Sequence, residues 1–222
     1  MRTAPVLRGG PVLSGVWLVV GLFLFACGIV CFLESRLGLP PWDVLHQGIA
    51  KHTPLPFGVA NEVVGVVVLF VAWGLGSRPG IGTLANAVLI GAFVVVLQPL
   101  HAAHALGDGS TAGRVGVLAA GLVLFGVGSA LYIGAGLGAG PRDSLMLVGS
   151  TRTGLRVGAV RAGIESAVLV AGFLLGGRVG VGTVLFALLI GPSVEGAFVL
   201  ASRSRLAAAP RSGYDRAADS PG

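Results

Sequence analysis

Charged residues are scarce in this chain of 222 residues: only 11% are Asp, Glu, Lys or Arg, less than half of the roughly 25% usual in soluble domains. Cysteine is also scarce. Cys27 and Cys31 lie four positions apart in an apolar run, which places them on one helix face, where no disulfide is expected. These shortages exclude an ordinary cytosolic enzyme, a disordered protein and a disulfide scaffold. Apolar residues (54%) and glycine (38 residues) are abundant instead.

The apolar residues are collected into six runs of about 20 residues, the length that a helix needs to cross a hydrocarbon core of about 30 Å. The runs lack the alternation of a barrel strand, and only helices and closed barrels satisfy the backbone in lipid. We therefore predict an all-α membrane protein in contact with the lipid bilayer. Its six transmembrane helices are expected over Val12–Leu33, Phe57–Gly76, Ile81–Leu100, Val115–Leu137, Val157–Gly176 and Val181–Ala201.

The positions of Lys and Arg predict how these helices are oriented. With the N-terminus in the cytoplasm, 11 of the 15 basic residues lie in cytoplasmic segments, and the four external ones are Arg36, Lys51, Arg114 and Arg178. Cytoplasmic loops of membrane proteins carry the excess of basic residues, so both termini are expected in the cytoplasm. The scattered basic residues also argue against a nucleic-acid partner, because such a partner requires a basic stripe.

An internal repeat organises the chain. Shifted by 100 positions, the sequence matches itself without a gap, and 27 of 82 aligned pairs are identical. The longest shared patterns are L-G-x-x-P-x-D-x-L, beginning at Leu37 and Leu137, and G-x-R-x-G-x-G-T, beginning at Gly76 and Gly176. Each copy holds three helices, an odd number, so the second copy enters the membrane from the opposite side. The predicted fold is a 3+3 inverted-topology repeat, the plan of many secondary transporters.

The repeat also sets the expected division of the chain. A cytoplasmic N-terminus precedes the first repeat, and an external connector joins the first repeat to the second. A tail rich in Arg, Ala, Ser, Pro and Asp follows the second repeat in the cytoplasm and is predicted to be disordered. The segments are 1–11 (N-terminus), 12–100 (first repeat), 101–114 (connector), 115–202 (second repeat) and 203–222 (tail).

The connectors Arg36–Pro56 and Gly138–Arg156 hold the first functional candidates. Gly and Pro break the preceding helix in each, and Asp follows where a short helix could begin, since Asp is a favoured N-cap. Such a helix either lies flat at the membrane interface or is a tucked half-helix whose N-terminal turn faces a central cavity. In the second case the residues expected to line the cavity and bind a solute are Trp42, Asp43, His46, Arg142 and Asp143.

Polar residues inside the predicted spans are the second set of candidates, because charge at membrane depth is costly and marks function by default. Arg161 and Glu165 lie four apart and can pair along one helix face. Glu165 either only neutralises Arg161 or is a coupling carboxylate that binds a proton or cation during transport. The other polar residues at such positions are Asn61, Glu62, Asn86 and Glu195.

Signals for catalysis are missing from the sequence. The repeated G-x-R-x-G-x-G-T turn follows no strand and lacks the Lys-Ser/Thr of a phosphate loop; its glycines favour a tight turn, and Thr83 and Thr183 are expected to cap the next helix. No nucleophile–base pair and no metal-ligand spacing is visible. We therefore expect no enzyme activity, no metal and no cofactor.

The run from Leu37 to Gly48, the paired Gly-x-Gly-Thr turns and the segment Gly140–Asp143 resemble the YczE-like bacterial membrane proteins, which are related more distantly to the YitT group. The resemblance covers residues 12–200. It implies a location in the cytoplasmic membrane of bacteria and no settled activity. Together with the inverted repeat, it leads us to expect a secondary transporter of a small solute. The alternative is a non-transporting scaffold that assists a neighbouring enzyme or secretion system.

Overall fold

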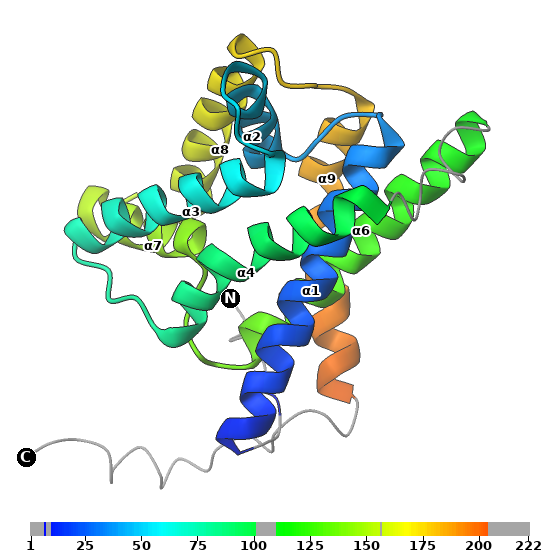
Figure 1. Cartoon of the computed structure of the whole chain (residues 1–222). Coiled ribbons are helices and arrows are strands. Elements are labelled where there is room, and N and C mark those ends of the chain that lie inside the picture. Colours follow the sequence, from blue (N-terminus) through cyan, green and yellow to red (C-terminus); the bar gives the residue numbers. More distant parts are fainter. Residues whose placement is uncertain (1–6, 8–9, 101–109, 156, 204–222) are drawn as a thin grey trace, which may run out of the picture.

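The computed structural model of the chain describes Leu7 and residues 10–100, 110–155 and 157–203. Most of the expected connector 101–114 and nearly all of the expected tail 203–222 lie outside the described residues, as does most of the segment 1–11. The regular elements of the described part are helices (Figure 1). They are α1 (Pro11–Ser35), α2 (Pro41–His52), α3 (Phe57–Gly74), α4 (Ile81–Leu97), the 3-10 turn η1 (Gln98–Leu100), α6 (Thr111–Gly134), α7 (Pro141–Thr153), α8 (Val157–Leu174) and α9 (Val181–Arg203).

Five segments of the described residues are long and apolar enough to cross a membrane: α1, α3, α4 extended by η1, α6 and α9. The prediction of an all-helical, multi-pass membrane protein is confirmed. The prediction of six spans is met in part, because the run predicted over Val157–Gly176 forms a helix, α8, that is not among the five. α8 has 18 residues and carries the two charges of Arg161 and Glu165.

Large apolar side chains cover much of the outer surface. Phe70 on α3, Phe173 on α8 and Leu188 on α9 are each at least 59% exposed. Soluble monomers rarely expose apolar patches on this scale, and hydrocarbon is the solvent in which such a surface is stable.

The helices of the two halves of the chain correspond at the expected offset. α1, α2, α3 and α4 begin at residues 11, 41, 57 and 81, and α6, α7, α8 and α9 begin at 111, 141, 157 and 181. The short helices α2 and α7 occupy the two connectors in which the sequence predicted a helix-forming segment.

The long helices α1 and α6 lie against each other in the centre of the molecule (Figure 1). Gly21 packs on Gly128 and Gly28 packs on Gly121, and a Cβ atom built on Gly21 would lie 2.8 Å from the Gly128 carbonyl oxygen. The contact runs forward along α1 and backward along α6, so the helices are antiparallel. Between the two glycine contacts the rings of Phe25 and its equivalent Phe125 meet with centroids 4.4 Å apart.

The two halves exchange equivalent contacts at the turns before α4 and α9. The Gly82 amide donates to the Leu137 carbonyl, and the Gly182 amide donates to the Leu37 carbonyl, both at 2.8 Å. Gly38 and Gly138 both have a φ of +124°, a conformation that favours glycine. Each turn therefore requires glycine at this position, because its backbone has a positive φ there.

The exchange extends to the short helices, since α2 packs against α8 and α7 packs against α3. Gly48 of α2 approaches Gly172 of α8, and a Cβ atom on Gly48 would lie 2.9 Å from the Gly172 carbonyl oxygen. Each half thus supplies the surface on which the short helix of the other half rests.

Candidate functional site

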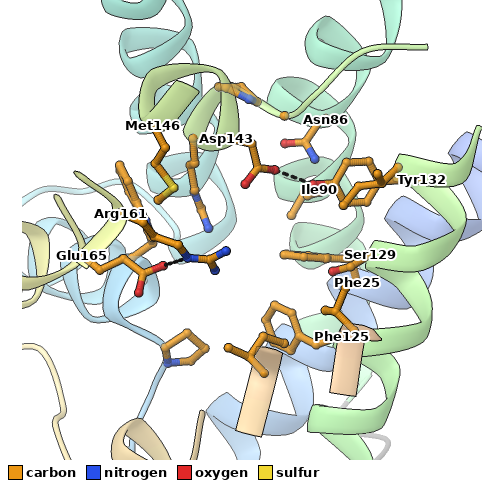
Figure 2. Close-up of a pocket in the computed structure, with 18 of the residues that line it drawn as sticks. Phe25, Asn86, Ile90, Phe125, Ser129, Tyr132, Asp143, Met146, Arg161 and Glu165 are labelled. Carbon is orange, nitrogen blue, oxygen red and sulfur yellow. Dashed lines mark hydrogen bonds and ion pairs between the residues drawn. The ribbon is translucent and has the colours of Figure 1, made fainter. Parts of the chain in front are cut away.

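A cavity of about 900 Å³ lies between the helices, and every α-helix of the described part contributes to its wall. Figure 2 shows the polar groups on this wall, among them Asp143, Arg161 and Glu165, together with the rings of Phe25, Phe125 and Tyr132. Most pockets that bind small molecules have a volume of this order and combine apolar walls with a few polar groups.

The first turns of the two short helices meet at this cavity. Its lining includes Pro40–Asp43 at the start of α2 and Gly140–Asp143 at the start of α7. Pro41 and Pro141 occupy the first helical position, which suits proline because its fixed φ is helical and no amide is needed there. The partial positive charge of both helix dipoles is therefore directed at one space.

The expectation that the two Asp residues are N-caps is wrong. The N-cap residues are Pro40 and Gly140, and neither helix has a side-chain cap. Asp43 and Asp143 lie in the first turn, two residues after Pro41 and Pro141, because these prolines start each helix earlier than predicted. Their carboxylates instead bond to side chains around the cavity.

Asp43 belongs to a buried network that also includes His46, Asn61 and Arg142. Asp43 Oδ1 lies 3.1 Å from His46 Nδ1, and Arg142 Nη2 lies 3.5 Å from His46 Nε2. Arginine can only donate, so Nε2 accepts and the proton of the neutral ring is on Nδ1, from which it is donated to Asp43. The Asn61 amide, 3.2 Å from Nδ1, shares this proton when its oxygen faces the ring.

His46 is fully buried in the short helix α2. Burial lowers the pKa of its imidazole from the ordinary value, by more than the hydrogen bond to Asp43 raises it. A neutral ring agrees with the hydrogen-bond pattern.

Two further polar pairs lie on the cavity wall. The Tyr132 hydroxyl donates to Asp143 Oδ2 at 2.8 Å, and Arg161 Nε donates to Glu165 Oε1 at 2.9 Å (Figure 2). The Arg161–Glu165 pair is the one that the spacing of four residues predicts.

Arg142 and Trp42, which are equivalent positions of the repeat, contact each other across the two halves. The guanidinium carbon of Arg142 lies 4.9 Å from the centroid of the Trp42 ring, within the range of a cation–π interaction. The Trp42 side chain is 6% exposed, and its indole Nε1 is buried without a hydrogen-bond partner.

A family model described as a family of unknown function (DUF6198) matches residues 13–197. The chain belongs to this family. It is 37% identical over 182 residues to the uncharacterized membrane protein YczE of Bacillus subtilis, covering 81% of this chain and 83% of the relative. It is 38% identical to an uncharacterized protein of Haemophilus influenzae, with coverage of 79% and 81%. The uncharacterized protein YyaS of Bacillus subtilis is 26% identical, with coverage of 78% and 86%. No solved structure matches the chain significantly.

Membership in this YczE-like family confirms the resemblance seen in the sequence. The family supplies no residue roles, so the site rests on the placement of the side chains alone. Of the residues predicted to bind a solute, Trp42, Asp43, Arg142 and Asp143 line the cavity, and so does the coupling candidate Glu165. His46 is not on the wall but lies behind Asp43. That these residues bind a solute stays a prediction.

Sequence reasoning missed Tyr132 and Ser129, both of which line the cavity. A signal for Tyr132 exists in the repeat, because its equivalent is Phe32 and the exchange adds a hydroxyl to an otherwise matched aromatic position. Ser129 stands opposite Ile29 in the same comparison. At these two positions the polar group that one copy gains lies on the cavity wall. Within the described residues no group of three His, Cys, Asp or Glu is placed to hold a metal ion.

Proposed function

We propose that this protein is a secondary transporter of a small solute in the bacterial cytoplasmic membrane, and not an enzyme. The observation that carries the proposal is the meeting of two helix N-terminal turns, those of α2 and α7, at one cavity lined by both halves of the chain. Broken helices whose N-termini face a central site are the usual way in which secondary transporters hold polar groups at membrane depth.

The proposal includes a 3+3 inverted repeat in which α8 spans the membrane in addition to the other five helices. The reciprocal contacts support it: Gly21 with Gly128 and Gly28 with Gly121 are the same contact after exchange of the halves. Because α1 and α6 are antiparallel, a two-fold axis relating them runs perpendicular to both, between Phe25 and Phe125. For membrane-spanning helices this axis lies in the membrane plane. The Arg161–Glu165 pair reduces the cost of placing α8 in lipid, since the two charges neutralise each other.

Such symmetry offers a route to alternating access. If the halves differ in conformation, exchange of the two conformations produces a second state related by the axis, in which the cavity opens to the other side of the membrane. The orientation proposed for the chain, with both termini in the cytoplasm, follows from the 11 basic residues in cytoplasmic segments against four outside.

Transport is tested with purified protein in proteoliposomes, using a panel of radiolabelled amino acids, organic acids, amines and sugars. We expect uptake of at least one class, and we expect Asp43→Asn and Asp143→Asn each to reduce it, because each neutralises a carboxylate bonded at the cavity. Asp219→Asn, in the segment predicted to be a cytoplasmic tail, is the matched control. Uptake unchanged in both cavity variants would refute the site.

Accessibility of the cavity separates a transporter from the alternative scaffold. In a background without Cys27 and Cys31, Ser129→Cys on the cavity wall should react with a membrane-impermeant thiol reagent from both sides of the membrane. Val67→Cys, on the outer surface of α3 and 55% exposed, is the control that lipid should protect. Failure of Ser129→Cys to react from either side would favour a closed, non-transporting scaffold.

A further inference from the structure

Some charged side chains on the cavity wall have a hydrogen-bond or ion-pair partner within the protein, and others do not. Three of the four carboxylates have a hydrogen-bond or ion-pair partner: Asp43 with His46, Asp143 with Tyr132 and Glu165 with Arg161. The remaining carboxylate is Glu195 of α9, which has no hydrogen bond or ion pair among the described residues. One anionic group of the wall is therefore left without a partner.

One cation of the wall is left as well. Arg161 is paired with Glu165, but Arg142 has no carboxylate within ion-pair distance in the described part of the chain. Its only polar contact there is the long one to His46 Nε2, at 3.5 Å. A guanidinium has five N–H donors in a planar fork that matches a carboxylate, so most of its hydrogen-bonding capacity is unused.

The surroundings of Arg142 favour an anionic group. The first intrahelical bonds of α2 and α7 are donated by the amides of Val44 and Ser144, so the amides before them lie outside the helical pattern, at the positive ends of both dipoles. The indole N–H of Trp42, buried and without a partner, is a further donor beside the same guanidinium. A buried donor without a partner is uncommon in folded proteins. The indole nitrogen has almost no accessible surface, so a bound acceptor satisfies it once a neighbouring side chain moves aside.

We propose that the solute is a zwitterion, a small molecule with one carboxylate and one ammonium group. Its carboxylate binds at Arg142 and Trp42, where the first turns of α2 and α7 meet, and its ammonium group pairs with Glu195. This assignment rests on the transporter function proposed above and names the class of its substrate.

The total charge of the wall separates a zwitterion from a simple anion. Four carboxylates face two guanidinium groups, so an anion without its own positive charge meets a net repulsion, and a doubly charged phosphate meets a stronger one. A simple amine would pair with Glu195 but would leave the Arg142 and Trp42 donors unused. The rings of Phe125 and Phe186 on the wall provide apolar surface for the remainder of the molecule and attract an ammonium group by cation–π interaction.

Binding is measured on the full-length protein in detergent, where no transport is required, by the rise in melting temperature with ligand concentration. The probes are two matched triplets: phenylalanine, phenylpropionate and phenethylamine, and leucine, isocaproate and isoamylamine. In at least one triplet the amino acid should bind more tightly than both the acid without the ammonium group and the amine without the carboxylate. An acid or amine that binds as tightly as its amino acid, or a panel without any binding, would overturn the proposal.

The variants locate the carboxylate subsite. Arg142→Gln should weaken binding of the amino acid about 10- to 100-fold, the loss typical of a charge-assisted hydrogen bond. Trp42→Phe keeps an aromatic ring but removes the N–H donor together with the second ring of the indole, and should weaken binding of the same ligand. Arg152→Gln is the matched control: Arg152 lies on the same helix, and its Nε donates to the Leu75 carbonyl at 2.8 Å. Equal affinity in wild type, Arg142→Gln and Trp42→Phe would refute the subsite.

The result also separates the two proposals. Amino-acid binding without uptake into proteoliposomes would refute the transporter and leave the subsite standing. Uptake of a solute that lacks a carboxylate would refute the subsite and leave the transporter standing.

Discussion

The crossing of α1 and α6 provides a quantitative test of the fold through Gly128. A Cβ atom at Gly128 would lie 2.7 Å from the Gly21 carbonyl oxygen and 2.7 Å from the Phe25 amide nitrogen. Real Cβ atoms do not approach backbone this closely, so Gly128→Ala must push the two helices apart. Overpacking of this kind costs about 1–3 kcal/mol, against a gain of about 1 kcal/mol because alanine is the better helix former.

Gly116 on the same helix is the matched control, because a Cβ atom there would meet nothing within 4 Å. Gly116→Ala gains the same helix propensity without the clash, so the difference between the two variants isolates the crossing. That difference is about 1–3 kcal/mol, or about 2–12 °C in melting temperature for a chain of this length. Thermal unfolding in detergent, followed by far-ultraviolet circular dichroism, measures it.

The equivalent contact in the other half of the repeat, between Gly121 and Gly28, provides a third variant for this test. At Gly121 the nearest atoms are Cys31 Cβ and Phe32 Cδ2 at 3.0 Å and the Gly28 carbonyl oxygen at 3.2 Å, all farther away than the backbone atoms that face Gly128 at 2.7 Å. Gly121→Ala should therefore fall between the other two variants. Gly128→Ala as stable as Gly116→Ala would refute the close antiparallel crossing.

Three further outcomes are expected. Thr83→Val should lower stability by about 1–3 kcal/mol relative to Thr83→Ser, because the Thr83 hydroxyl donates to the Ala139 carbonyl at 2.6 Å and accepts from the Gly80 amide; equal melting temperatures in the two variants would contradict this role. Glu165→Gln should remove the dependence of uptake on a proton or cation gradient while solute binding persists, and uptake that still follows the gradient would exclude Glu165 as the coupling carboxylate. Alkaline phosphatase fused after Gly107 should be active and after Gly154 inactive, and the reverse pattern would overturn the orientation.

The helices were predictable because their signals are local. An apolar run of about 20 residues and the glycines and prolines that end it are read directly from the chain, and the offset of 100 in the sequence aligns α1 to α4 with α6 to α9. The start of α2 and α7 was misplaced because proline at the first helical position outweighs Asp as an N-cap. The proline signal and the Asp signal lie within three residues of each other, and the sequence alone does not show which of them sets the start of the helix.

The site was only partly predictable, since its partners are distant in sequence. Spacing within one helix predicted Arg161 with Glu165, but the contact of Arg142 with His46 joins residues 96 positions apart. The neighbour of Asp143 is Tyr132, in a different helix. Such contacts depend on how α2 and α7 cross the halves, which no periodicity within one segment encodes.

The exchange of short helices between the halves has a consequence for synthesis of the protein in the cell. α2 begins at residue 41, but α8, against which it packs, begins at residue 157. At a translation rate of about 5–20 residues per second, the ribosome needs roughly 6–23 s to reach α8 after it has made the start of α2. During that interval the first half stands in the membrane with the Gly48 face of α2 bare. The first half, which contains polar groups, must therefore stay in the membrane without its contacts until the second half, related to it by the two-fold axis, has been made. The last step of folding is then the docking of the two halves.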